Sequence, residues 1–183
     1  MKKIIALVLA LALTMGCCAA LAESVEKTEL GTLNGAFKLV CVVPEGYKLS
    51  VPQIDNEGLI AKLSALDGDE TKPELWLVVE FDEQYFDVKR MNDMTEEQLD
   101  QIIQTFPDNG ENVVVSYGET AYGTKVMIVK DSNVPPQNMA VLSVYEGFMI
   151  EIDAIDIEEG LTDEEIQLCI DFFSNMDFLP AEA

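Results

Sequence analysis

The fold of this chain is decided by one stretch near its centre, Glu74-Leu75-Trp76-Leu77-Val78-Val79-Glu80-Phe81-Asp82. Every second position of this stretch holds a leucine, a valine or a phenylalanine, and Trp76 and Val78 stand between them. Successive side chains of a strand point to opposite faces of a sheet, so this alternation is typical of a strand with one buried face. We therefore predict a strand over residues 74–82 and a sheet built around it.

Further segments rich in β-branched and apolar residues predict more strands of ordinary length. They lie at residues 36–43, 47–51, 58–66, 112–117, 123–130, 139–145 and 148–155. Residues 58–66 also suit a helix, but the turn-like Asp67-Gly68-Asp69 favours a strand that leads into the next one. Short turns at residues 119–122 and 146–147 indicate antiparallel hairpins. We also expect residues 176–179 to dock at the edge of a sheet.

Two helices are predicted from matching N-terminal patterns. Thr95 and Gln98 form a capping box, in which each side chain can satisfy the backbone N–H of the other residue, and Thr162 and Glu165 repeat it. Each box is followed by apolar residues at helical spacing, which gives the helix one apolar face. These residues are Leu99, Ile102, Ile103 and Phe106 in the first helix and Ile166, Cys169, Ile170 and Phe173 in the second.

Strands and helices in this order, joined by hairpins, predict an α+β domain. The expected architecture is a twisted antiparallel sheet of about six to seven strands with two main amphipathic helices packed on it. We expect this single domain to occupy residues 36–179. A flexible leader at residues 23–35 should precede it, because that segment is polar and lacks periodicity, and a tail at residues 180–183 should follow it.

The layout resembles that of a known family, the Mog1/PsbP/DcrB-like superfamily of small exported α+β proteins. The resemblance rests on Phe37-Lys38-Leu39-Val40-Cys41-Val42-Val43-Pro44-Glu45-Gly46-Tyr47, a strand that ends in Pro-x-Gly-aromatic. It rests also on the capped helix, the tight turn at residues 118–123 and a final helix that ends in Asp177-Phe178. It implies a twisted antiparallel sheet with helices packed on it, and it implies no catalytic residue.

The first 22 residues have the three regions of an export signal. Lys2 and Lys3 precede an apolar run, and Ala20-Leu21-Ala22 is a small-x-small cleavage site. We predict cleavage after Ala22 and a secreted or extracytoplasmic protein of bacterial type. An uncleaved anchor remains an alternative. A lipoprotein modified at Cys17 or Cys18 fits less well, because Thr14 and Met15 stand where such a signal needs leucine or a similar residue.

The mature chain would be strongly acidic. Cleavage removes two lysines and no acid, which leaves 9 basic and 34 acidic residues and a formal charge of −25. Binding to a phosphate backbone requires lysine and arginine, so a nucleic-acid role is excluded, and an anionic membrane would repel the chain. The acidity suits solubility, and it also suits a cation or a basic partner.

The usual catalytic groups are scarce. The chain has no histidine, which removes Ser-His-Asp and Cys-His pairs and histidine metal sites. Cys41 and Cys169, the cysteines that remain after cleavage, lie far apart in the sequence and are expected as buried thiols or as a disulfide. Paired carboxylates are the remaining route to hydrolysis, but with 34 acids such pairs arise by chance. We therefore assign no catalytic residue and no cofactor.

Two candidate sites remain. Asp67, Asp69 and Glu70 are candidate calcium ligands, although the glycine position of a twelve-residue calcium loop that begins at Asp67 holds Lys72. A candidate interaction face comprises Trp76, Tyr85, Phe86 and Tyr122, which lie in or just after strands and turns where aromatic side chains can reach solvent.

The sequence therefore predicts a monomeric, non-catalytic, exported domain that interacts with another envelope or extracellular protein and that does not insert into a membrane after cleavage. The alternatives are an acidic calcium-binding protein and a small carboxylate-dependent hydrolase.

Overall fold

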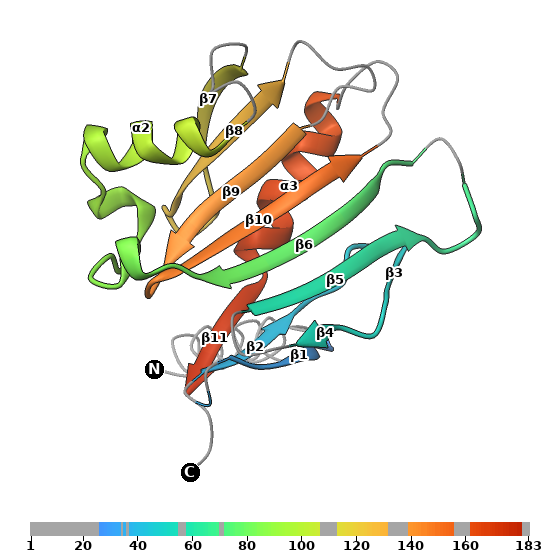
Figure 1. Ribbon diagram of the computed structural model, residues 1–183. Coiled ribbons are helices and arrows are strands. Elements are labelled where there is room, and N and C mark those ends of the chain that lie inside the picture. Colours follow the sequence, from blue (N-terminus) through green and yellow to red (C-terminus); the bar gives the residue numbers. More distant parts are fainter. Residues whose placement is uncertain are drawn as a thin grey trace, which may run out of the picture.

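The computed structural model describes residues 26–33, 35, 37–54, 58–69, 72–106, 113–131, 139–155 and 162–180. Within these residues the chain forms eleven strands in two antiparallel sheets, two α-helices and two 3₁₀ helices (Figure 1). The export segment at residues 1–22, with Cys17, Cys18 and Ala22, lies outside the described residues, and so do Glu70 and residues 181–183.

The prediction of an α+β domain with two main helices on one sheet is wrong, because the chain is predominantly β. The two α-helices within the described residues are short, α2 at Glu96–Thr105 and α3 at Asp163–Ser174. Two short strands add to those expected, β1 at Thr28–Leu33 and β4 at Gln53–Ile54, and the segment expected to dock at a sheet edge forms a third, β11 at Met176–Pro180. These segments show little alternation of their own, since pairing with a neighbouring strand holds them in the extended conformation.

The first of these strands also corrects the expected leader. Residues 28–33 are not an irregular segment but pair with β2 (Phe37–Cys41) in antiparallel register, with Leu30 and Leu33 buried. β11 pairs with the other side of β2, so the expected docking of residues 176–179 at a sheet edge is confirmed. Together β1, β2 and β11 form the smaller sheet.

The larger sheet has the order β3-β5-β6-β10-β9-β8-β7, with β4 paired to β5. The members not yet located are β3 (Tyr47–Leu49), β5 (Gly58–Ala65), β6 (Glu74–Phe81), β7 (Val113–Glu119), β8 (Lys125–Asp131), β9 (Met139–Tyr145) and β10 (Phe148–Ile155). The expected alternation in β6 is confirmed, because Leu75, Leu77 and Val79 are fully buried on one face. We call this face the inner face and the opposite one the outer face.

The inner face is covered over most of its width, whereas Val114 on the edge strand β7 is 60% exposed on this face. The smaller sheet packs over β5 and β6, and α3 lies behind β9 and β10 (Figure 1). Cys41 and Cys169 are both buried in this layer as free thiols. Burial raises the pKa of Cys41 to about 11 and, with a further effect of Glu165, that of Cys169 to about 12, so both stay protonated at neutral pH.

The outer face is covered on one side only. The 3₁₀ helices Glu83–Tyr85 and Met91–Asp93 lead into α2, and this segment packs on β8 and β9 (Figure 1). Tyr85, Met91 and Ile102 are buried there against Met127 and Leu142. We call this region the covered half and the part formed by β5, β6 and β10 the open half.

Both predicted capping boxes are confirmed. The backbone N–H of Gln98 donates to Thr95 Oγ1 at 3.2 Å, and that of Thr95 donates to Gln98 Oε1 at 3.0 Å. In α3 the corresponding bonds join Thr162 and Glu165 at 3.3 and 2.7 Å. The caps fix where each helix begins and so which strands it covers.

Candidate functional site

The open half of the outer face carries a mixed apolar and acidic surface. Its apolar members are Ile60, Trp76, Val78 and Met149, and its charged members are Lys62, Glu74, Glu80, Glu151 and Asp153. We call these nine residues the open face. The strand register sets them side by side, because Lys62 lies opposite Trp76 and Ile60 opposite Val78 on neighbouring strands. Cross-strand pairs of this kind fix the pattern of a sheet surface.

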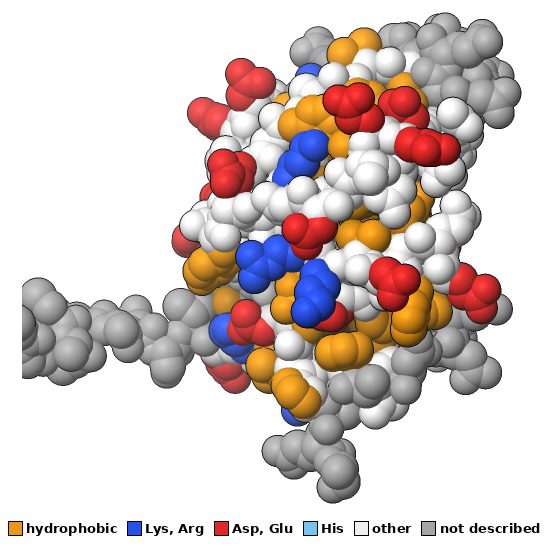
Figure 2. Space-filling view, turned by 90° about the vertical axis from the view of Figure 1, so that its left-hand side faces the viewer, with side chains coloured by type: hydrophobic (Ala, Val, Ile, Leu, Met, Phe, Trp, Pro, Cys, Tyr) orange, Lys and Arg blue, Asp and Glu red, His pale blue; other side chains and the backbone are white. Residues whose placement is uncertain are grey.

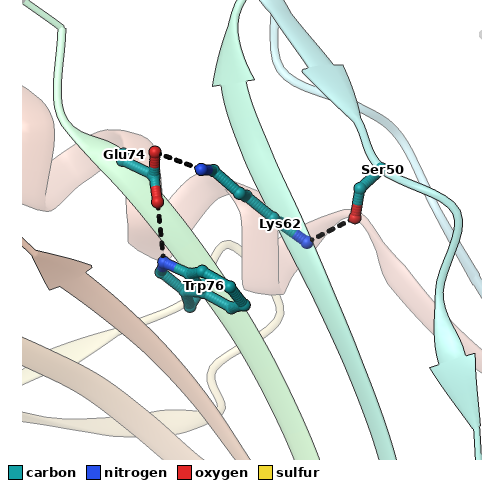
Figure 3. Close-up of polar contacts among 4 residues, drawn as sticks. All are labelled: Ser50, Lys62, Glu74 and Trp76. Atoms are coloured by element: carbon teal, nitrogen blue, oxygen red, sulfur yellow. Dashed lines mark hydrogen bonds and ion pairs between the residues drawn. The ribbon is translucent and has the colours of Figure 1, made fainter.

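Trp76 is held in place by its neighbours (Figure 3). Its indole Nε1 donates to Glu74 Oε1 at 3.0 Å, and Glu74 also pairs with Lys62. The Lys62 ammonium lies 5.5 Å from the centre of the Trp76 ring, and the Lys62 backbone N–H donates to Ser50 Oγ at 2.9 Å. A half-exposed ion pair stabilises the fold little, but these contacts preset the orientation of the indole.

Two carboxyl groups meet at the border between the two halves. Glu151 lies opposite Val78 on one side and buried Leu142 on the other, and Asp153 lies opposite Trp76 and buried Ala140. Both carboxyl groups point outward from the same strand, and a hydrogen bond between them contributes to their titration.

The titration of this pair is strongly shifted. Burial, followed by the charge of Asp153, a hydrogen bond to Asp153 and the charge of Glu80, raises the pKa of Glu151 to about 8. Burial also raises the pKa of Asp153, against the lowering effect of its hydrogen bond to Glu151. Two carboxylates this close cannot both ionise easily, so the pair retains a proton at neutral pH.

The aromatic residues of the predicted interaction face do not come together. Tyr85 is 2% exposed within the covered half, so its inclusion was wrong: the 3₁₀ helix turns it inward and leaves Phe86, 67% exposed, outside. Phe86 packs on Phe81 at the end of β6. Tyr122, 75% exposed, lies in the turn after β7. Only Trp76 belongs to the open face.

The predicted calcium ligands are not brought into a cluster. Asp67 and Asp69 are exposed in the segment between β5 and β6, and Glu70 lies outside the described residues. Within the ranges that the structure describes, no three cysteine, aspartate or glutamate side chains are placed to hold a metal ion.

The sequence interpretation missed the Glu151–Asp153 pair. The signal was present, because the two acids stand two residues apart in a strand whose other face is apolar, Phe148-Met149-Ile150-Glu151-Ile152-Asp153. That spacing puts both on one face of the sheet. Their burial depends on contacts outside this strand, which the sequence of the strand itself does not reveal.

A pocket of about 380 Å³ lies at the other end of the sheet, away from Trp76. It is bounded by β11, by the turn between β7 and β8 and by the adjoining ends of β9 and β10. Its lining residues are Arg90, Thr120, Tyr122, Thr124, Ser143, Tyr145, Ile150, Phe173, Met176, Asp177, Phe178 and Leu179. The carboxyl pair of the open face is not among them, so the carboxyl pair and the pocket are separate features.

Comparison with known protein families gives no match, and comparison with curated proteins gives none. Among the helices of the described part of the chain, none combines the length and the hydrophobicity needed to cross a membrane. The resemblance to the Mog1/PsbP/DcrB-like superfamily therefore stays a proposal that rests on the sequence pattern.

Proposed function

We propose that this protein is an exported, non-catalytic interaction domain whose open face binds a basic segment of another polypeptide in the cell envelope or extracellular space. One observation carries the proposal. The only tryptophan of the chain stands on a half-open sheet surface that holds four carboxyl groups and one lysine within the described residues. Export rests on residues 1–22, and membership of the Mog1/PsbP/DcrB-like superfamily is part of the same proposal.

The open face has the chemistry of an interaction site. Tryptophan is enriched among the residues that dominate binding energy, because it buries a large area at a small cost in side-chain entropy. Ile60, 41% exposed, and the half-buried Val78 extend the apolar surface around it. The contacts of Trp76 with Glu74 and Lys62 order its ring before a partner arrives, which lowers the entropic cost of binding.

The charge of the face selects the partner. Glu80 is exposed, and the Glu151–Asp153 pair holds a proton that it can release to solvent when a cation binds beside it. A lysine or arginine placed beside the pair stabilises the ionised form, so binding releases a proton. Affinity should therefore rise as the pH rises towards 8, where free Glu151 ionises unaided.

A peptide of alternating lysine and leucine is the direct probe, because one of its faces is apolar and the other basic. Titration should shift the fluorescence of Trp76, the single indole of the chain. A matched peptide of alternating glutamate and leucine should give no shift.

Tyr117, 48% exposed on β7, provides a control variant. By calorimetry, Trp76→Ala should weaken binding about tenfold, whereas Tyr117→Ala should leave it within about twofold. Equal losses in the two variants would contradict the proposal.

A carboxylate-dependent hydrolase is the second candidate, and the raised pKa of Glu151 favours it. The pair lies on a sheet surface and not in the pocket, so a substrate would have to bind across the open face. Hydrolysis of a chromogenic glycoside that is lost in both Glu151→Gln and Asp153→Asn, and retained in Glu80→Gln, would support this candidate. Undetectable turnover by the unmodified protein would rule it out for that substrate.

A further inference from the structure

Hydrogen bonds join the elements that surround the pocket at the β11 end of the molecule. Asn92 joins the turn between β7 and β8 to the segment before α2, because its Nδ2 donates to the Gly123 carbonyl at 3.0 Å and its Oδ1 accepts from the Lys125 N–H at 2.9 Å. On the other side, the Ala121 N–H donates to Ser174 Oγ at 3.0 Å. Tyr122 therefore projects from a turn that is anchored at both ends.

One wall is aromatic. The rings of Tyr145 and Phe178 lie 4.9 Å apart with their planes tilted by 36°, and Phe173 and Tyr122 complete the lining. Such rings offer flat apolar surfaces and edges to another ring. The volume, about 380 Å³, is within the usual range of roughly 300–1,000 Å³ for small-molecule sites.

The polar part of the lining centres on Arg90, the single arginine of the chain. Its backbone pairs with that of Tyr145, which fixes its position at the wall. Among the described residues no carboxylate lies within ion-pairing distance of Arg90, whereas Asp177, the acid of the lining, is paired with Lys27. The guanidinium of Arg90 is therefore available to form an ion pair with an anionic group of a ligand.

Hydroxyl groups lie in the same lining. Ser143 is buried and donates to the Lys125 carbonyl at 2.9 Å, which leaves its oxygen able to accept a bond. Thr120 Oγ1 accepts from the Thr124 N–H at 3.0 Å, which leaves its O–H able to donate.

Figure 2 shows the side of the molecule on the left of Figure 1, where basic side chains gather among apolar ones with acids around them.

We propose that this pocket binds a small monocarboxylate joined to an aromatic ring, with the carboxylate on Arg90 and the ring against Tyr122, Tyr145 and Phe178. A planar guanidinium matches a carboxylate in a bidentate pair. A single arginine within a strongly acidic protein suits one negative charge better than the two of a phosphate monoester. The site is separate from the open face, and neither proposal depends on the other.

N-acetyl-L-phenylalanine is the probe, and calorimetry of the full mature chain measures its binding. Two analogues of the probe test the two contacts separately. N-acetyl-L-phenylalanine amide lacks the charge, and N-acetylglycine lacks the ring. We expect saturable binding of the probe and a loss of at least about tenfold with either analogue. A short peptide that ends in phenylalanine distinguishes the sources, since binding as tight as that of the probe assigns the site to a chain end and loss of binding assigns it to a free acid.

Arg90→Gln and Lys89→Gln form a matched pair, because the two residues are adjacent and exposed, each variant removes one charge, and only Arg90 lines the pocket. Arg90→Gln should weaken binding of the probe about tenfold and leave binding of the amide unaffected. Lys89→Gln should change neither affinity by more than about twofold. Unchanged melting temperatures verify that both variants fold.

No saturable binding of the probe at millimolar concentration, or equal losses of affinity in the two variants, would overturn the assignment. The Trp76 fluorescence should not respond to the probe, so failure here is distinguishable from failure of the open face.

Discussion

The two halves of the outer face show what a second layer does to a sheet. On the covered half, Leu142 and Val144 of β9 are 1% and 0% exposed beneath the segment that leads into α2. On the open half, Trp76 and Val78 occupy equivalent outward positions on β6 and remain partly exposed. The strands are alike in length and pairing, so the difference comes from the cover, which extends only as far as β9. The open half is therefore a surface with apolar content that the chain's own described elements do not bury.

Truncation of one side chain in each half should give the largest difference. Leu142→Ala leaves a cavity beneath the cover and should lower the free energy of unfolding by about 2–5 kcal/mol. Val78→Ala on the open half should cost less, about 1 kcal/mol, because this side chain is only partly buried and its loss leaves no enclosed cavity. Urea unfolding of both variants measures the difference. Equal losses would show that the open half is buried in solution, for instance by self-association.

The carboxyl pair at the border should make stability depend on pH. Burial raises the pKa of Glu151 from 4.5 to about 8, so between these values the folded chain holds a proton that the unfolded chain has released. The stabilisation that this proton brings is complete below pH 4.5 and is lost as the pH rises through about 8. Glu151→Gln keeps a neutral side chain, and it should match the unmodified protein at about pH 5 and melt at a higher temperature at about pH 8.5. A lower melting temperature for the variant at the higher pH would contradict the account.

Removal of one helix cap tests the cover itself. Thr95→Ala removes the hydrogen bond to the Gln98 N–H at the start of α2 and should cost about 1 kcal/mol. Hydrogen exchange should rise in α2 and in β8 and β9 beneath it, with little change in β5. Thr162→Ala, the equivalent change in α3, should cost a similar amount but raise exchange on the inner face. The same exchange pattern in both variants would mean that the two layers do not unfold independently.

Calcium should produce the smallest effect. Asp67 and Asp69 are exposed near the end of β5 and are not gathered with a third described acid. We expect millimolar calcium to leave the melting temperature unchanged, because a ligand stabilises a fold only where the native state binds it. A rise that Asp67→Asn abolishes would instead support the calcium alternative.

Much of this fold could be predicted from local sequence. Both helices begin where their capping boxes place them, because Thr95 and Thr162 bond to backbone groups three residues away. The alternation in β6 correctly gave its buried face. β1 and β4 could not be predicted in this way, because neighbouring strands hold them in place and their own periodicity does not.

The functional features depended even more on distant contacts. The inward turn of Tyr85 follows from the short helix that contains it, and the pocket is assembled from β11, a turn and the ends of two strands. Arg90 could be recognised in the sequence as the only arginine, but nothing in its neighbourhood indicates the aromatic wall beside it. The raised pKa of Glu151 depends on its burial and on the charges of Asp153 and Glu80, and Glu80 lies on another strand, far from Glu151 in the chain.

Charge reversal on the two halves tests the central claim most directly. Glu80→Lys changes the open face, and Asp100→Lys makes the same change on the exposed side of α2 over the covered half. The two variants carry the same net charge, so general attraction of a basic peptide to an acidic protein is lowered equally. We predict that the lysine–leucine peptide binds Glu80→Lys at least about tenfold more weakly than Asp100→Lys at moderate ionic strength. Equal affinities for the two variants would contradict the assignment of the open face as the binding surface.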